Sequence, residues 1–289
     1  MKFSFITIVL NGMPFIKHSL RSIYDFADEI IVIEGPVEKL KNSFKSRNFL
    51  SNDGTTEFLD EFPDPDNKIK IIRGVFNDKV DMQNLALQHS NNEWIWLIDS
   101  DEVYKNEDLK YIKRKLNEFP DLIRIDFIPL NFWKGFNFIF ESEKFHLPPY
   151  HYKRIFKRQK NDYFTTHRPP TLESHINTEF VRMVNFIPGD FLLNEGKTIY
   201  HYSYVDLLQV KQKIDLYSEY GWGKTWEIDL QEWFEKFYLK WNPSNRKKLE
   251  LKYAPWTGDK NSYTTRFAGQ HPKEILSDIK LLSDYDYSF

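Results

Sequence analysis

The chain has 289 residues (34.9 kDa), of which 41% are hydrophobic and 28% charged, and its mean hydropathy is -0.58. This profile excludes a wholly disordered, collagen-like or coiled-coil protein and is typical of a large globular α/β domain. The 40 Lys and Arg residues nearly balance the 42 Asp and Glu residues, which excludes a global field that would hold nucleic acid or an anionic membrane. The sequence contains no cysteine, which excludes disulfides, thiolate metal sites and cysteine nucleophiles.

The N-terminus begins with Met1-Lys2 and an apolar run over residues 3–10, as a signal peptide does. The next four residues, Asn11-Gly12-Met13-Pro14, offer no cleavage site of small residues, and the run is far shorter than the roughly 20 apolar residues that span a bilayer. We therefore interpret residues 3–10 as a first strand and expect a cytoplasmic protein without a transmembrane segment.

The first 34 residues predict a strand, a helix and a second strand. Residues 3–10 are β-branched and apolar, and Pro14 is expected to open a helix over residues 14–27, where apolar residues recur at helical spacing. Residues 29–34 then form another apolar run. A βαβ unit of this length implies a parallel sheet.

The alternation of strands and helices continues to residue 129. After a polar stretch at 36–65, the pattern predicts a strand at 68–73, a helix at 81–90, a very apolar strand at 93–98, a helix at 106–119 and a strand at 122–129. Composition shifts near residue 130. Beyond it we expect short strands at 153–158 and 198–202 and helices at 204–220, 229–241 and 272–282.

Aromatic residues make up 17% of the chain, and two interpretations of them remain open. Flat rings stack on bases and sugars, but a core rich in Phe gives the same composition. The same ambiguity holds for a C-terminal tryptophan set, which could line an acceptor groove, dock on a membrane or form a packing face. Its members are Trp222, Trp226, Trp233 and Trp241.

Acidic residues follow two of the predicted strands. Glu34 ends the strand at 29–34, and Asp99 and Asp101 follow the strand at 93–98. Ligands of open parallel sheets bind beyond the carboxyl ends of the strands. Two carboxylates one residue apart repel each other unless a cation lies beside them, and hard oxygen ligands suit Mg²⁺ or Mn²⁺. The alternative is that Asp99 and Asp101 only cap the following turn.

Three segments together resemble a GT-A fold glycosyltransferase of the family 2 type. They read FITIVLNGMPFIKHSLRSIYDFADEIIVIEG, NDKVDMQNLALQHSNNEWIWLIDSDE and IYHYSYV. The resemblance covers roughly residues 1–130 and, more thinly, 150–215, and Asp99-Ser100-Asp101 matches the DxD motif of the family. It implies a Rossmann-like α/β fold with a mostly parallel central sheet flanked by helices, followed by an aromatic-rich helical C-terminal part.

The resemblance also implies roles for particular residues. Glu34 stands where the family has an acid that contacts the base or ribose of the donor, and Lys79 lies in a region near the donor phosphates. Asp99 would face the ribose and the metal, Asp101 would bind the metal, and His201 resembles a histidine that completes the metal site.

Two features depart from the family pattern. An Asp-Gly-Ser run usually follows the second strand, whereas here Gly35-Pro36 follows and the similar Asp53-Gly54-Thr55-Thr56 comes about twenty residues later. Residues 150–200 lack a Glu-Asp pair that would supply the catalytic base. We assign the base to Glu173, because the preceding Pro169-Pro170 pair stiffens its approach. Three neighbouring residues, His167, Arg168 and His175, either contact phosphate or acceptor or belong to a solvated loop.

The resemblance therefore implies a metal-dependent, inverting glycosyltransferase with Mn²⁺ or Mg²⁺ as cofactor. It would move a sugar from a nucleotide-sugar donor to a hydroxyl of a saccharide or lipid-linked acceptor in glycan biosynthesis, with peripheral membrane contact left open and no nucleic acid partner. We expect residues 1–130 to form the donor-binding half, 131–203 the acceptor-side and metal-completing half, and 204–289 a helical elaboration.

Two alternatives remain beside this interpretation. A nucleotidyltransferase can share the sheet and the acids, although it usually carries a Gly-rich basic loop where this chain has Asn11-Gly12-Met13-Pro14. The second alternative is a carbohydrate-binding relative that has lost catalysis. A nucleotide-dependent and metal-dependent thermal shift distinguishes it from the enzyme.

Overall fold

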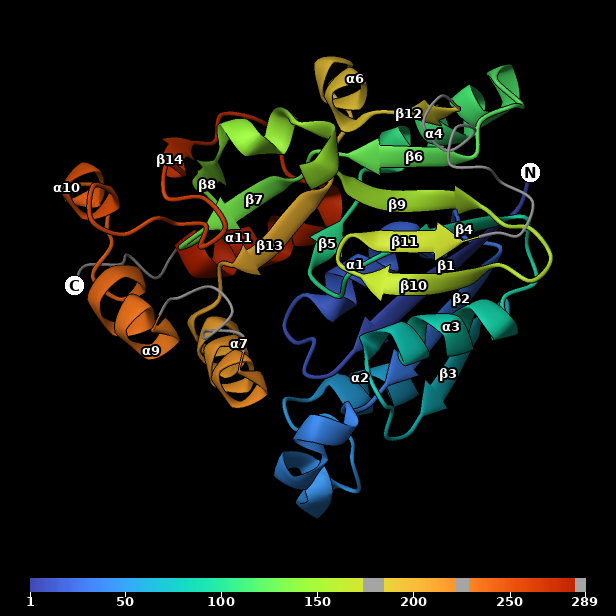
Figure 1. The fold of residues 1–289 in the computed structure, drawn as a ribbon, viewed down its shortest axis with the longest axis horizontal. Coiled ribbons are helices and arrows are strands. Elements are labelled where there is room, and N and C mark those ends of the chain that lie inside the picture. Colours follow the sequence, from blue (N-terminus) through green and yellow to red (C-terminus); the bar gives the residue numbers. More distant parts are fainter. Residues whose placement is uncertain (174–184, 222–228, 284–289) are drawn as a thin grey trace.

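The computed structural model describes residues 1–173, 185–221 and 229–283, and a seven-stranded sheet runs through its centre (Figure 1). The strand order is β12-β6-β9-β4-β1-β2-β3. Strands β3, β2, β1 and β4 are parallel, β9 is antiparallel to both β4 and β6, and β12 is parallel to β6. The strands are β1 (Phe3–Val9), β2 (Glu29–Glu34), β3 (Ile69–Arg73), β4 (Trp94–Leu97), β6 (Arg124–Phe127), β9 (Tyr152–Lys157) and β12 (Phe186–Ile187). This confirms the predicted fold class, an α/β fold with a largely parallel central sheet flanked by helices.

Both faces of this sheet are covered by apolar packing. In β4, Trp94 and Trp96 belong to one hydrophobic cluster, whereas Ile95 and Leu97 belong to another, and all four side chains are buried. The alternation follows from the two-residue period of a strand, and burial on both sides explains the continuous apolar run in the sequence. The helices around the sheet are α1 (Ile16–Tyr24), α2 (Thr55–Glu61), α3 (Lys79–His89) and α4 (Asn106–Glu118), with a 3₁₀ segment η1 (Glu38–Arg47).

The first helix starts later than its sequence pattern predicts. Pro14 lies in a turn, and α1 begins at Ile16, whose amide donates to the Gly12 carbonyl oxygen (2.9 Å). The loop after β1 is held away from the helical path because the Gly12 amide donates to Thr55 Oγ1 (2.8 Å) and the Met13 amide to Asp53 Oδ2 (2.9 Å). The helices η1 and α2 lie in the polar stretch at 36–65, where apolar residues are too sparse to predict them.

A second, five-stranded sheet has the order β14-β8-β7-β13-β5 and lies beside the first (Figure 1). Its strands are β5 (Glu102–Val103), β7 (Leu130–Trp133), β8 (Phe138–Glu141), β13 (Tyr200–Tyr204) and β14 (Tyr263–Arg266). Strand β5 follows β4 after only four residues and pairs antiparallel with β13, with Glu102 opposite His201. This pairing joins the β4 end of the first sheet to the β13 side of the second sheet, where β5 is the edge strand.

Aromatic side chains fill the space behind the second sheet. Trp133, Trp233 and Trp241 are buried together, and the ring of Trp133 meets the other two edge-on at 5.8 and 6.1 Å. Trp233 and Trp241 therefore belong to a packing face, and Trp222 and Trp226 lie outside the described residues. The helical segments of this part are η2 (Glu143–His146), η3 (Pro148–Tyr150), α6 (Gly189–Asn194), α7 (Leu207–Tyr220), α9 (Leu230–Trp233), η4 (Phe234–Tyr238), α10 (Arg246–Glu250), η5 (Lys273–Ile275) and α11 (Leu276–Ser283).

A β-hairpin of β10 (Tyr163–His167) and β11 (Pro170–Glu173) packs on helix α3 and strand β9. Asn84 of α3 fixes it, because its side-chain amide donates to the Phe164 carbonyl (2.9 Å) and accepts from the Phe164 amide (2.7 Å). The tip of the hairpin, residues 168–169, is thereby held above the sheet. Among the helices of the described ranges, none combines the length and the apolarity that a membrane span requires.

Candidate active site

A pocket opens at the carboxyl ends of β1, β2 and β4, where the sequence predicts the chemistry. Its floor comes from the ends of these strands, with Asn11, Gly35, Asp99, Ser100 and Asp101 among the lining residues. Its other walls come from later parts of the chain. They include Lys79 of α3, His167 and Arg168 of the hairpin, His201 and Ser203 of β13, and Gln209, Lys213 and Tyr217 of α7.

Asp101 and His201 meet in this pocket although a hundred positions separate them. The His201 Nε2 atom lies 3.3 Å from Asp101 Oδ1, and both side chains are about nine-tenths buried. The other ring nitrogen, Nδ1, donates to Asn131 Oδ1 (2.7 Å), so Asn131 fixes the ring and directs Nε2 at the carboxylate. A neutral imidazole in this orientation presents a lone pair to a carboxylate oxygen, an arrangement that requires a proton or a cation between the two atoms.

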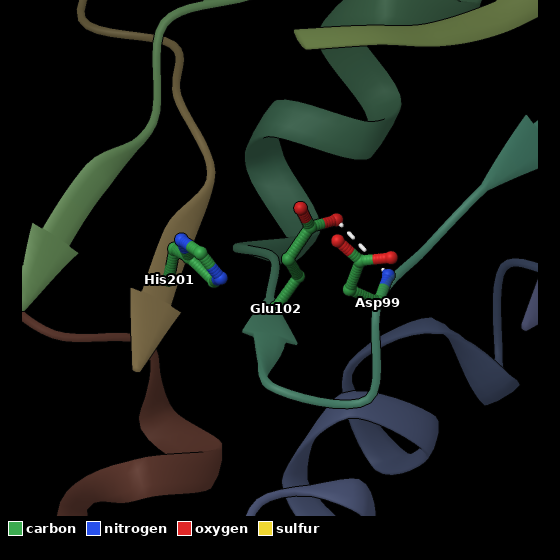
Figure 2. A group of neighbouring side chains, drawn as sticks. All are labelled: Asp99, Glu102 and His201. Carbon is green, nitrogen blue, oxygen red and sulfur yellow. Dashed lines mark hydrogen bonds between the residues drawn. The ribbon is translucent and has the colours of Figure 1, made fainter. Parts of the chain in front are cut away.

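The donor set around this pair fits a divalent cation. One ligand atom each of Asp99, Glu102 and His201 lies within 4.8 Å of the others, and Figure 2 shows Asp99 on the turn after β4, Glu102 on β5 and His201 on the neighbouring strand β13. Two ligand atoms that each lie about 2.1 Å from one ion, with an angle of roughly 90° at the ion, are about 3 Å apart. The 3.3 Å between Asp101 Oδ1 and His201 Nε2 is close to this spacing. Asn131 matches the second-shell acceptor that metal-binding histidines usually have. The predicted metal residues Asp99, Asp101 and His201 thus line one pocket, although the compact set of three ligand atoms contains Glu102 in place of Asp101.

Arg154 of β9 pairs with the two other acids of this turn. Its Nη2 atom lies 2.7 Å from Asp99 Oδ2, and its Nε atom donates to both carboxylate oxygens of the fully buried Glu102 at 3.1 Å. Burial alone would raise the pKa of Asp99, but the guanidinium groups of Arg154 and Arg168 outweigh it and lower that pKa to about 2. Burial also raises the pKa of Glu102, and Arg154 only partly offsets it.

Lys213 of α7 holds the second oxygen of Asp101. Its Nζ atom lies 3.2 Å from Asp101 Oδ2 and donates to the carbonyl (3.2 Å) and the hydroxyl of Ser203. Gln209 Nε2, one helical turn earlier, lies 3.5 Å from the same Oδ2. Burial would raise the pKa of Asp101, but Lys213 and His201 outweigh it and hold that pKa well below its usual range.

Three cationic side chains, those of Lys79, Arg168 and Lys213, line the same pocket as Tyr217 of α7. Burial would raise the pKa of Tyr217, yet these three charges outweigh it and lower that pKa. Burial, with a further contribution from Arg168, lowers the pKa of Lys79, which lies at the first position of α3. Cations that depress the pKa of a phenol also favour an anion bound among them.

His167 at the hairpin tip is a neutral base in this pocket. Burial, followed by the charges of Arg168 and Lys79, lowers its pKa to about 3. Within the described ranges, neither ring nitrogen of His167 has a hydrogen-bond partner. Of the two interpretations of this segment, the pocket placement favours ligand contact over a solvated loop for His167 and Arg168, and His175 lies outside the described residues.

Glu34 lies at the end of β2, fully buried, and its oxygens are occupied by the protein. Arg73 Nε lies 2.8 Å from Oε2, and Thr56 Oγ1 donates to Oε1. The next residue, Gly35, lines the pocket in its place, and at its φ of +147° a Cβ would lie 1.9 Å from the Gly74 carbonyl oxygen. The structure therefore does not bring Glu34 into the pocket lining with Lys79, Asp99 and Asp101.

The Asp53-Gly54-Thr55-Thr56 run, which comes later in this chain than the family pattern has it, contacts the loop after β1 and the end of β2. Asp53 accepts from the Met13 amide (2.9 Å) and the Thr55 amide (3.0 Å), and Thr56 donates to Glu34. The intervening residues 38–47 form η1 and bulge out from the sheet edge. The delayed Asp-Gly-Thr-Thr run thus supports the loops after β1 and β2.

Glu173 lies at the opposite end of the hairpin from the pocket. It pairs with Tyr163 across the two strands, and Tyr163 Oη donates to its Oε2 (3.2 Å). Residues 170–173 are extended, so Glu173 lies roughly 10 Å along β11 from Pro170 at the hairpin tip. The structure does not bring Glu173 together with the other predicted residues, and its role as base stays a prediction from the sequence.

Sequence reasoning missed Arg154, Lys213, Asn131 and Asn84. Arg154 occupies a strand predicted at 153–158, and a charged residue in a strand buried on both faces signals a partner for nearby acids. Lys213 and Gln209 lie four residues apart on the predicted helix at 204–220, a spacing that puts both on one face. Asn131 and Asn84 gave no local signal, because each acts through a pairing between distant segments.

Comparison with known proteins shows that residues 50–172 match the family model described as glycosyl transferase family 2. No curated protein sequence matches the chain. The recognised resemblance to a family 2 glycosyltransferase is confirmed by this match.

Several solved structures are similar to the chain. The structure of S. aureus TarS 1-349 is 16% identical, with a TM-score of 0.43 over 86% of this chain and 78% of that one. A TarS 1-349 complex with UDP-GlcNAc is 17% identical, with the same TM-score over 86% and 79%. A complex of the mannosyltransferase PcManGT from Pyrobaculum calidifontis with GDP-Man and Mn²⁺ is 20% identical, with a TM-score of 0.36 over 44% and 35%. This chain covers only 28% of another TarS crystal structure.

Proposed function

We propose that this chain, a glycosyltransferase whose residues 50–172 belong to family 2, transfers a sugar from a nucleotide-sugar donor to an acceptor hydroxyl with the help of a divalent cation. The observation that carries the proposal is the convergence of Asp101 and His201 at 3.3 Å beside the cations Lys79, Arg168 and Lys213. A diphosphate leaving group gains negative charge as it departs, and that charge has to be stabilised. This pocket contains carboxylates that can bind a metal ion and cationic side chains that can contact phosphate, and both stabilise such charge. In this proposal residues 1–130 supply the donor floor, 131–203 the metal-completing side, and 204–289 a further wall.

Asp99, Asp101 and His201 would hold the cation, which is Mn²⁺ or Mg²⁺. When bound, it would neutralise charge that builds on the departing diphosphate. Arg154 keeps Asp99 ionised and oriented, and Asn131 keeps the Nε2 atom of His201 directed at Asp101. Arg168 and Lys79 lie where they can contact phosphate oxygens that the metal does not cover. Glu34 would affect the donor indirectly: it would fix the loop that contains Gly35, and this loop would contact the base or ribose of the donor.

In this proposal the acceptor is a saccharide or a lipid-linked saccharide, and the reaction belongs to glycan biosynthesis. A single displacement would invert the anomeric carbon, and its base must lie on the side of the sugar that faces away from the diphosphate. Asp99 and Asp101 are the carboxylates among the pocket-lining residues of the described ranges, and this proposal assigns both to the metal. The base would then come from another position, for which the sequence offers Glu173 after the Pro169-Pro170 pair.

The proposal is tested by nucleotide binding and by donor turnover. Thermal unfolding is measured with UDP, GDP or CMP, each with and without Mn²⁺, and release of the nucleoside diphosphate is measured from the matching sugar nucleotides. We expect one nucleoside diphosphate to raise Tm by several degrees only when Mn²⁺ is present, because ligand that binds only the folded state stabilises it. Absence of stabilisation and turnover with every nucleotide would contradict the proposal and favour a binding protein without catalysis.

The His201→Ala variant tests the metal assignment within this proposal. A neutral imidazole contributes a ligand but no charge, so we expect its loss to weaken Mn²⁺ affinity about 10-fold to 100-fold, less than the loss of Asp101. His146, which is exposed on η2, provides the matched control as His146→Ala. An unchanged Mn²⁺ dependence in His201→Ala would remove His201 from the metal site.

A further inference from the structure

Asp101 is already neutralised by a cation of the chain itself. Its Oδ2 atom faces the ammonium group of Lys213 at 3.2 Å and the amide of Gln209 at 3.5 Å, while its Oδ1 atom faces His201. Each oxygen that a metal would need is therefore paired with a group of this protein. A dication bound to Asp101 would repel the ammonium group beside it.

The other acids of the turn are balanced differently. Arg154 pairs with both Asp99 and Glu102, and its guanidinium is buried between them on a rigid strand. Lys213 instead reaches Asp101 at the end of a flexible four-carbon stem from the helix α7, and its side chain keeps 17% of its exposure at the pocket wall. Lys213 is thus the counter-ion in this site that can change partners without unfolding a strand.

We infer that Lys213 alternates between two anions: it holds Asp101 in the empty site and moves to the donor diphosphate when the metal occupies Asp101. This inference rests on the proposed function and assigns Lys213 as a positioning and diphosphate-binding residue. No bond is made or broken in the exchange, and the charge stays balanced because the dication replaces Lys213 at Asp101 while the diphosphate adds negative charge beside it.

The arrangement of α7 supports the exchange. Gln209, Lys213 and Tyr217 follow one another at intervals of four residues, so they share the helix face that lines the pocket. The side chains of Arg168 and Lys79 line the same pocket and act electrostatically on Tyr217, as Lys213 does. A diphosphate among these groups would give the displaced ammonium a second anion within a side chain's reach.

The opposite face of α7 offers a matched control. Lys211, two residues before Lys213, is about half exposed and pairs with Asp215 one turn later at 2.5 Å. Substitution of Lys211 by Met removes the same charge from the same helix without touching the pocket. A helical or general electrostatic effect would appear equally in Lys211→Met and Lys213→Met.

The test measures two affinities in the full-length chain, by titration calorimetry. The first is the affinity for Mn²⁺ alone, and the second is the affinity for inorganic pyrophosphate and for UDP and GDP at saturating Mn²⁺. For Lys213→Met we expect Mn²⁺ alone to bind about 10-fold more tightly, because the competing cation is gone. We expect pyrophosphate and the responsive nucleotide to bind about 10-fold more weakly, because one phosphate contact is lost. Lys213→Arg should restore the second affinity in part.

The two changes of opposite sign identify the exchange. If Lys213→Met weakens both affinities, Lys213 only supports the shape of Asp101, and the inference is overturned. If neither affinity changes, or if Lys211→Met gives the same changes, the inference is also overturned. Failure of the proposed function looks different, because the wild-type chain would then bind neither Mn²⁺ nor any nucleotide, and the inference would fall with it.

Discussion

The pocket has an acidic wall and a basic wall, and they differ in origin and in rigidity. The acidic wall is the short turn between β4 and β5, through Asp99 and Asp101. The basic wall is assembled from the first turn of α3, the hairpin tip and α7, through Lys79, Arg168 and Lys213. Acids gathered in one turn depend on cations that arrive from elsewhere, because neighbouring buried carboxylates repel each other. The placement of α3, the hairpin and α7 is therefore a condition for the charge state of the acidic turn.

The dependence is visible in the two aspartates. Burial opposes ionisation of both Asp99 and Asp101. Arg154 of β9 and Arg168 of the basic wall reverse that effect and lower the pKa of Asp99, and Lys213 of the basic wall and His201 lower the pKa of Asp101. A change in one wall should thus alter the other. Substitutions that remove one charged residue of the site at a time show which residues contribute to ligand binding and which contribute to the stability of the fold.

Asp101→Asn in the acidic wall should have the largest effect. The amide keeps the shape of the side chain but loses the charge that Lys213, His201 and a metal would share. We expect turnover to fall about 1000-fold or more and the Mn²⁺-dependent thermal shift with nucleotide to disappear. Asp66→Asn, on an exposed loop, is the control for removal of a negative charge. Turnover within tenfold of wild type would exclude Asp101 as a metal ligand.

Arg154→Met should damage the fold more than the ligand site. The substitution leaves Asp99 and the fully buried Glu102 without their common cation, and loss of one partner of a buried ion pair costs about 3–5 kcal/mol. Urea unfolding at pH 7 measures this loss. The exposed pair of Arg114 and Glu118 on α4 gives the control, and Arg114→Met should cost less than about 0.5 kcal/mol. A loss under 1 kcal/mol for Arg154→Met would show that Glu102 is protonated in the native state.

The two walls also differ in how far the sequence predicts them. The strand before Asp99 is so apolar that its central place could be predicted, and the acids after it could be placed at the ligand edge. His201 was predicted through the family resemblance and lies on β13, within the strand that the local pattern predicts at 198–202. Lys213 and Arg154 could not be assigned, because a lysine on a helix and an arginine on a strand acquire a role only when a partner from a distant segment is placed beside them.

Local sequence patterns do not predict the strands of the hairpin and most strands of the second sheet. β7, β8, β10, β11 and β14 have four or five residues each, too few for a two-residue period to be distinguished from chance. Their pairing depends on contacts such as that of Asn84 with Phe164, which are eighty residues apart in sequence. The mostly parallel sheet could be predicted because its central strands β1, β2 and β4 are buried on both faces.

Glu141 on β8 contrasts with the paired acids of the pocket. Burial raises its pKa to about 7, and no described charged group is placed to offset this. The folded chain therefore binds more protons than the unfolded chain between about pH 4.5 and 7, so stability falls as pH rises through this range and levels off above it. Glu141→Gln removes this slope, because the amide does not titrate. We compare the free energy of unfolding of the variant with that of the wild type at each pH. The difference, variant minus wild type, should be about 1–3 kcal/mol larger at pH 8 than at pH 4.

Urea unfolding of both proteins at the two pH values measures the slope. Glu143→Gln, two residues later and exposed, should change stability equally at both pH values. A slope that persists unchanged in Glu141→Gln would assign it to another buried acid, of which Asp126, with a pKa raised by burial to about 6, is the next to substitute.

The smallest effect is expected at Glu173, the predicted base. Its carboxylate accepts from Tyr163 at the far end of the hairpin, roughly 10 Å along β11 from Pro170 at the tip, whereas a base has to lie about 3 Å from the hydroxyl it deprotonates. From this placement we expect Glu173→Gln to change kcat less than about threefold. Tyr163→Phe, which removes only the hydroxyl partner, should have an effect of the same size if Glu173 serves the hairpin alone. A fall in kcat of about 100-fold in Glu173→Gln, with nucleotide affinity unchanged and Tyr163→Phe near wild type, would instead identify Glu173 as the base. That result would mean that the acceptor is bound along the hairpin and that the sugar is attacked from this side, so the donor would have to extend out of the pocket past Arg168.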